Sequence, residues 1–200
     1  MDKDEAKRYL KEAKELNDGP WIGHSKHVAR LAERIAAAAG MEEEKAYCMG
    51  LLHDIGRRNG KMQARHAIEG YRFLMKEGFP EIARICLTHT FQYQNVDGIY
   101  GSWDCSPKEK EFVRNYLAQT VYDDYDKLIQ LCDALSLSDG WCFAEKKMVA
   151  SALKFGVNEM TLNKWKATLD LKKYFDEKTG SDIYEYLKKG RDGLFQNLIL

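Results

Sequence analysis

The sequence predicts an all-α fold in a single domain of about eight to ten helices. Apolar residues recur at helical spacing along nearly the whole chain, and no stretch alternates between apolar and polar residues for more than a few positions. Gly, Pro and helix-capping residues separate the periodic segments. The chain has 200 residues, of which 44% are hydrophobic and 31% charged, so one buried core is expected rather than two domains.

The first three predicted helices each end at a glycine. They cover residues 3–17, 24–39 and 42–55. Gly19 and Pro20 follow the first of these helices, and together they form a strong stop signal. Gly40 stands where a C-cap glycine would end the second helix. The third helix begins in the acidic run 42–44, which suits the positive end of a helix dipole, and Gly56 ends it.

The next two predicted helices, residues 63–77 and 80–91, lead into a segment without helical period. Residues 92–107 (QYQNVDGIYGSWDCSP) mix Gly, Asn, Asp and aromatic residues, which predicts a long loop of the kind that often serves as a lid. We expect its aromatic side chains to pack the loop onto the body of the protein, with stacking on a nucleobase as the alternative. These side chains are Tyr93, Tyr100 and Trp103, just after Phe91.

Five further helices are predicted in the second half of the chain. They cover residues 107–122, 126–137, 143–155, 158–178 and 181–189. Pro107 suits the first turn of a helix, where its missing N–H removes no intrahelical hydrogen bond. The last three helices carry no functional signal, and we expect Trp141, Trp165 and Tyr174 in the core or in an interface.

The charges of the chain balance, with 31 Lys and Arg against 31 Asp and Glu. This balance argues against bulk attraction to nucleic acid or to an anionic membrane, although a local basic patch is compatible with it. The N-terminal residues have no apolar run of the signal-peptide kind, and no segment approaches the roughly 18 apolar residues of a membrane span. We therefore expect a cytoplasmic protein.

The histidines are concentrated in the first half of the chain. They are His24, His27, His53, His66 and His89. Histidine is the commonest metal ligand in proteins, and carboxylates complete sites for harder divalent cations. The pair His53-Asp54 falls in the last turn of the third helix, whose negative end favours a cation. Adjacent helical side chains diverge by about 100°, so both reach one metal only where the chain turns away, and Gly56 is expected to permit that turn.

The pair carries little weight alone, because five His and fifteen Asp supply about 0.4 such dipeptides by chance. Two other residues strengthen it. His24 opens the second predicted helix in the string HSKHVA, and Asp133 lies in the apolar run LIQLCDAL. A carboxylate in such a run either faces solvent or, if it is buried, needs a partner or a metal. Considered alone, Asp133 fits both interpretations.

These segments together resemble the HD-domain superfamily of metal-dependent phosphohydrolases. The family pattern is a His that opens one helix, an H-D pair that ends the next and an Asp on a later helix. Here HSKHVA, GLLHDIG and LIQLCDAL supply them in order, over roughly residues 20–140. The resemblance implies an HD-type helical core over residues 20–140, with residues 141–200 as a helical extension packed on it. It also implies bound divalent metal and hydrolysis of phosphoester or phosphoanhydride bonds.

Two more histidines, His66 and His89, lie between the H-D pair and Asp133, as in the binuclear members of the superfamily. The resemblance then implies two ions with Asp54 as the bridge. One ion would take His24, His53, Asp54 and Asp133, and the other Asp54, His66 and His89. Without the resemblance, a lone histidine is more often an ordinary surface or core residue. The register HSxxVA favours His24 over His27, which we expect beside the site or in solvent.

The chemistry implied for such a pair of ions is an in-line attack on phosphorus by a hydroxide that the metals make available near neutral pH. His53 and Asp54 are therefore the expected catalytic residues. Mn, Fe, Co, Ni and Zn all suit His and Asp ligands. The expected substrate is a nucleotide or another small phosphorylated metabolite.

Four basic residues follow the H-D pair and are candidates for phosphate contacts, because Arg in particular suits bidentate phosphate recognition. They are Arg57, Arg58, Lys61 and Arg65. A solvated basic turn is the alternative interpretation.

Two other functions share the same ligand pattern. HD-fold di-iron oxygenases use six such ligands to activate oxygen, and an HD-fold sensor or interaction module could keep the ligands for stability alone. Iron content and oxygen uptake would identify the first, and metal-dependent stability without turnover the second.

Overall fold

The computed structural model describes residues 1–187, and this range is all-α, which confirms the predicted fold class. Within it the only β-type pairing is one bridge between Ser136 and Trp141. None of its helices is both long and apolar enough to cross a membrane. The α-helices are α1 (Lys3–Leu16), α2 (Pro20–Ala38), α3 (Glu43–Leu52), α4 (Arg65–Lys76), α5 (Pro80–Thr88), α6 (Pro107–Gln119), α7 (Asp124–Ala134), α8 (Ala144–Phe155), α9 (Thr161–Thr179) and α10 (Ile183–Leu187).

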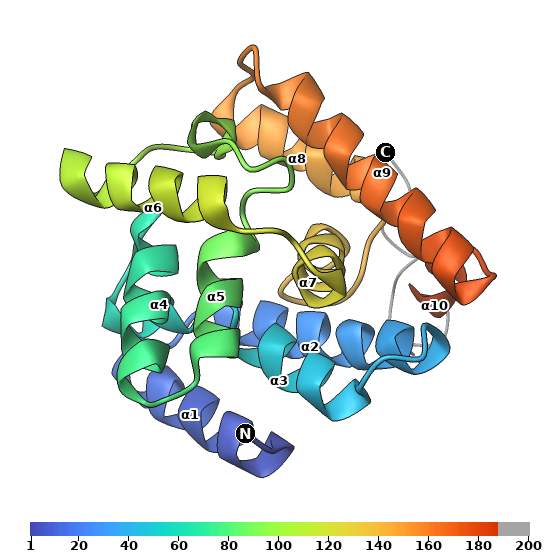
Figure 1. Cartoon of the computed structure of the whole chain (residues 1–200), viewed down its shortest axis with the longest axis horizontal. Helices are drawn as coiled ribbons and strands as arrows, with labels where there is room; N and C mark the ends of the chain where they lie inside the picture. The colour runs from blue at the N-terminus through green and yellow to red at the C-terminus, as the bar shows by residue number, and fades with distance from the viewer. Residues whose placement is uncertain (188–200) are drawn as a thin grey trace.

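Helix α7 lies at the centre of the molecule and is seen end-on in Figure 1. It packs against α2, α3, α5 and α9, and its apolar residues from Leu128 to Cys132 are buried. Its start is defined by Asp123, whose carboxylate accepts hydrogen bonds from the backbone N–H groups of Tyr125 and Asp126. In the last turn of α7 the side chain of Asp133 is partly buried, with 22% of its surface exposed.

Helices α2 and α3 pack closely against each other. A Cβ atom on Gly50 would lie 2.9 Å from Cα of Ala29, so the glycine permits this close approach of the two backbones. Helix α2 begins at Pro20, whereas the sequence predicted a start at His24. Pro20 occupies the first turn, which tolerates its missing N–H, so the predicted stop signal is also the start of the next helix.

The chain after α3 turns sharply. Helix α3 ends at Leu52, and a short 3-10 helix, η1 (Ile55–Asn59), follows the H-D pair. Gly56 lies inside η1 and does not adopt a positive φ. A Cβ atom there would collide with the backbone of His66 and Gly70. Gly56 therefore allows η1 to contact α4.

The segment between α5 and α6 is irregular apart from a short 3-10 helix, η2 (Val96–Gly98). Its aromatic side chains pack the loop onto the protein. Trp103 stacks on Phe91 and donates a hydrogen bond from Nε1 to the carbonyl of Val96, at 3.0 Å. Tyr100 stacks on Phe155 of α8. The alternative role of these rings, stacking on a nucleobase, requires a ring face that lines a cavity.

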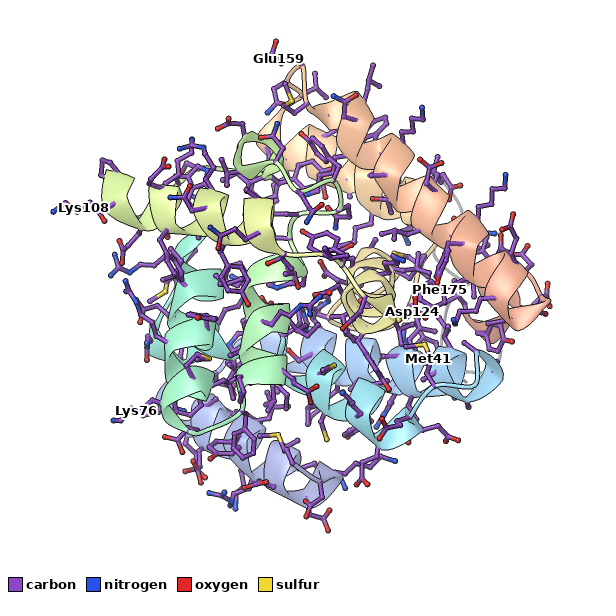
Figure 2. All side chains as sticks on the ribbon, viewed as in Figure 1. Met41, Lys76, Lys108, Asp124, Glu159 and Phe175 are labelled. Atoms are coloured by element: carbon purple, nitrogen blue, oxygen red, sulfur yellow. The ribbon has the colours of Figure 1, made fainter. Side chains whose placement is uncertain are left out.

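The C-terminal helices cover α7 and α2. Helix α9 contacts α7, α8 and α2, and α10 contacts α2 and α9. Phe175 lies on the inner side of α9 and is fully buried, whereas Lys76, Lys108 and Glu159 lie at the outer edge of the molecule (Figure 2). The predicted helix 181–189 corresponds to α10, and its last two residues lie outside the described range. The other predicted boundaries differ by a few residues, as is usual where helix ends fray.

Candidate metal centre

Six side chains from five helices meet beside the C-terminal end of α3. His53 is the C-cap of α3, and His89 is the C-cap of α5. Asp133 lies in the last turn of α7. All three thus stand at helix ends that carry partial negative charge, which favours a cation nearby. The full set is His24 from α2, His53 and Asp54 from the end of α3, His66 from α4, His89 from α5 and Asp133 from α7.

Asp54 is the centre of this cluster. Its Oδ1 atom lies 3.0 Å from Nε2 of His66 and 3.7 Å from Nε2 of His89, and its Oδ2 atom lies 3.9 Å from Nε2 of His53. Nε2 of His24 lies 2.9 Å from Oδ1 of Asp133. The rings of His24 and His53 have their centroids 5.2 Å apart.

Two overlapping groups of candidate ligands share Asp54. In each group the ligand atoms all lie within 4.8 Å of one another. Asp133 stands outside both groups and joins the first through its contact with His24. The groups are His24, His53 and Asp54, and Asp54, His66 and His89. The geometry thus brings together all six residues that the resemblance implied, with Asp54 common to both groups.

The backbone sets the tautomers of three of these histidines. Nδ1 of His53 lies 2.7 Å from the carbonyl of Gly50, and Nδ1 of His89 lies 3.1 Å from that of Ile85. Nδ1 of His66 contacts the carbonyl of Gln63 in the same way. A carbonyl only accepts hydrogen bonds, so each Nδ1 carries the proton and each Nε2 presents its lone pair to the cluster.

These lone pairs need a positively charged neighbour. Nε2 of His66 lies 3.3 Å from Nε2 of His89, and Nε2 of His53 is buried without a hydrogen-bond partner. Neighbouring acceptors of this kind repel one another unless a proton or a cation lies between them. Imidazole and carboxylate donors suit the divalent metals from Mn to Zn, so the residues present fit such ions.

The protonation states are those that metal binding requires. Burial lowers the pKa of His89 to about 3 and also lowers the pKa of His53, so both rings are neutral at pH 7. Burial raises the pKa of Asp54, but the guanidinium of Arg57 outweighs it and holds this pKa well below its usual range. The ammonium of Lys147 does the same for Asp133 against the effect of burial. Neutral imidazoles and ionised carboxylates bind metal without first releasing a proton.

The fifth histidine lies outside the cluster. Nδ1 of His27 is 2.8 Å from the carbonyl of Gly23, and its ring packs edge-on against Trp141. His27 is one helical turn beyond His24, but its ring packs against the chain that follows α7.

A cavity of about 1160 Å³ opens beside the cluster. Two of the four predicted phosphate contacts line it, Arg57 and Lys61. Nε of Arg57 donates to Oδ2 of Asp54 at 2.7 Å, and its Nη1 donates to the carbonyl of Met62 at 3.0 Å. Arg57 therefore orients the central carboxylate while it faces the cavity.

The other two candidates for phosphate contacts, Arg58 and Arg65, do not line this cavity. Arg58 stacks on the ring of Phe73, at 4.0 Å from its centroid. Arg65 pairs with Glu69 at 3.3 Å and lies 3.8 Å from Glu109. Successive side chains in a 3-10 helix diverge by about 120°, so Arg57 and Arg58 point in different directions.

Sequence reasoning missed the opposite side of the cavity. We call the lining residues of α8 and α9 the C-terminal wall, and the lining residues before position 140 the core wall. The C-terminal wall includes Lys147, Lys154, Phe155, Lys164 and Thr168. Nζ of Lys147 donates to Oδ1 of Asp133 at 3.0 Å. A lysine in a charged amphipathic helix normally indicates a solvated face, so no sequence signal marked these residues.

Comparison with known proteins identifies one family. A family model described as HD domain matches residues 21–138, which is more than half of the chain. No curated protein matches. No solved structure matches either. The matched range contains all six residues of the cluster and most of the core wall but stops before α8 and α9.

Proposed function

The chain belongs to the HD-domain family, and we propose that it is a metal-dependent phosphohydrolase that acts on a nucleotide or another small phosphorylated metabolite. One observation supports this most strongly. Histidine side chains converge on the carboxylate of Asp54 beside a cavity, and cationic side chains line other parts of the same cavity. A cavity of about 1160 Å³ has room for a nucleotide-sized ligand.

We propose two divalent ions that share Asp54. His24, His53 and Asp133 complete the ligands of one ion, and His66 and His89 complete those of the other. When bound, such ions supply a hydroxide nucleophile near neutral pH and neutralise charge on the phosphoryl group. The donor set is compatible with Mn, Fe, Co, Ni or Zn.

The chain's own residues hold this centre in place. The carbonyls of Gly50 and Ile85 fix the rings of His53 and His89, so that little rotational freedom is lost when a metal binds. Arg57 fixes the carboxylate of Asp54. Arg57 and Lys61 also face the cavity, where their charges would attract the substrate phosphate.

The test is a phosphate-release assay with protein loaded with Mn, Fe, Co or Ni, over a panel of nucleotides and sugar phosphates. We expect turnover of at least one compound, and its loss in the double variant His53→Ala, Asp54→Ala. The variant His27→Gln is the matched control, because His27 is on α2 but outside the cluster. Turnover that survives the double change would refute the proposal. Oxygen uptake without phosphate release would instead favour the oxygenase alternative.

A further inference from the structure

Lys164 is a buried cation on the C-terminal wall. Its exposed fraction is 7%, and it lines the cavity beside the metal centre. Its Nζ donates to the carbonyl of Thr90 at 2.9 Å and to the carbonyl of Gly98 at 3.1 Å. It also lies over the ring of Tyr100, 4.6 Å from the centroid. An ammonium group has three N–H donors, so one remains after the two carbonyl bonds.

The charge of Lys164 is not matched by an anion. Within residues 1–187 no carboxylate lies within ion-pair distance of its Nζ, whereas Lys147 on the same wall is paired with Asp133. Burial lowers the pKa of Lys164 to about 8, and the charge of Lys147 acts in the same direction, whereas Asp133 raises this pKa from beyond ion-pair distance. A buried cation without a counter-ion destabilises the fold, so its presence in a cavity indicates that a ligand supplies the negative charge.

Lys164 lies next to the metal centre. Thr90, whose carbonyl accepts the first hydrogen bond, directly follows His89. Oγ1 of Thr90 also lies 3.1 Å from Nε2 of His89. An anion held by the remaining donor of Lys164 would therefore sit beside the candidate ligands.

We propose that Lys164 binds an anionic oxygen of the substrate's phosphate group, next to the metal centre. The inference rests on the proposed function for the identity of the anion. Lys164 lies outside residues 21–138, so the family core does not supply it and the C-terminal helices do. The substrate-binding site then has two parts, metals and Arg57 on the core wall and Lys164 on the C-terminal wall.

A purely structural role would have a different signature. Lys164 ties the loop around Gly98 to the end of α5, and its loss could simply loosen that loop. Trp165, the next residue of α9, also ties this loop to α9, because its Nε1 donates to Oη of Tyr100 at 2.8 Å. Trp165→Phe removes a loop contact and leaves the ammonium group in place. Lys166→Met removes an exposed charge two residues away.

The experiment measures binding of inorganic phosphate, the reaction product, to the metal-loaded full chain by isothermal titration calorimetry. For Lys164→Met we expect a Kd that is higher by about tenfold or more, with unchanged metal content. Trp165→Phe and Lys166→Met should change the Kd by no more than about twofold. If Lys164→Met does not fold, Lys164→Gln keeps a hydrogen-bond donor without the charge and replaces it.

Three results would overturn the inference: no phosphate binding by the wild type, an unchanged Kd in the Lys164 variant, or an equal loss in Trp165→Phe. The failure of the proposed function is recognised separately. Phosphate binding that depends on Lys164, in a protein that hydrolyses no compound of the panel, would support the anion site and refute the hydrolase. Hydrolysis by a protein whose Kd for phosphate is the same with and without Lys164 would support the hydrolase and refute the anion site.

Discussion

The two walls of the cavity are built on different principles. On the core wall, side chains are held by the backbone, as the carbonyls of Gln63 and Ile85 hold His66 and His89. On the C-terminal wall, Lys147 is held by a carboxylate of the core, and Lys164 has no carboxylate partner within residues 1–187. The core wall thus carries most of the candidate metal ligands, whereas the C-terminal wall carries a buried cation that has no carboxylate in ion-pair contact within residues 1–187.

This difference separates two tasks within one cavity. Donors that are fixed before a metal arrives lose little conformational freedom on binding, which suits a resident cofactor. A buried cation without a counter-ion suits a transient anionic ligand. The attraction between the two charges is strong in a site of low polarity, and no protein carboxylate competes for the cation. Metal binding should therefore depend on the core wall, and ligand affinity on both walls.

The largest effect should come from Asp54, which both ligand groups share. We expect Asp54→Ala to lower phosphohydrolase activity by about a thousandfold or more and to remove most of the bound metal. Metal content by mass spectrometry and phosphate release measure the two effects. His27→Gln should retain both. Full metal content in Asp54→Ala would contradict the proposal that Asp54 is a ligand shared by both ions.

Removal of metal should destabilise the core wall. A chelator should lower the Tm of the metal-loaded protein by about 5–10 °C, because ions that bind only the folded state add a few kcal/mol to the free energy of unfolding. Differential scanning calorimetry measures the change. The Asp54→Ala protein should show a much smaller shift, and an equal shift in both proteins would place the metal elsewhere.

The unmatched charge of Lys164 should appear as a pH dependence of stability. Its pKa is lowered from 10.5 to about 8 in the folded protein, so between these pH values the unfolded chain binds more protons than the folded one. The free energy of unfolding of the wild type should therefore rise relative to that of Lys164→Met by about 2–3 kcal/mol from pH 8 to 10.5. Urea unfolding at each pH measures this difference.

Lys166→Met is the control for this experiment, because its side chain is exposed on the same helix. Its stability should run parallel to that of the wild type over the same pH range. If the free energy of unfolding of Lys164→Met also changes with pH as that of the wild type does, the ammonium of Lys164 is not desolvated in the folded protein.

The smallest effect should come from Lys147, which connects the walls. Its Nζ donates to Oδ1 of Asp133 at 3.0 Å and to the carbonyl of Ser136 at 3.2 Å, close to the negative end of α7. Lys147→Met should lower the free energy of unfolding by about 1–2 kcal/mol. Lys146→Met should change it by less than about 0.5 kcal/mol in the same urea titration. Equal effects would show that the contact with Asp133 adds no stability.

The core wall could be predicted from sequence because its residues stand at positions that local patterns mark. The strings around His24 and His53 lie at helix ends that Pro20 and the acidic run 42–44 help to locate. The resemblance to the HD-domain superfamily, which the order of these strings carries, then implied that the side chains meet. Arg58 points away from Arg57 because the turn that holds both is 3-10 rather than α, which residue type does not reveal, and Arg65 pairs with Glu69 on α4.

The sequence by itself determined the helices, through apolar spacing and capping residues, and it supplied the donor types, His and Asp, in the order that the HD-domain family shares. The tertiary structure alone decided which cations face the cavity. The sequence pattern around Lys164 is that of an ordinary amphipathic helix, and this lysine became buried only because α9 packs across α7 and the loop around Gly98. The physical reason is range: helix formation depends on neighbours within a few residues, whereas burial of one side chain depends on segments more than sixty residues away.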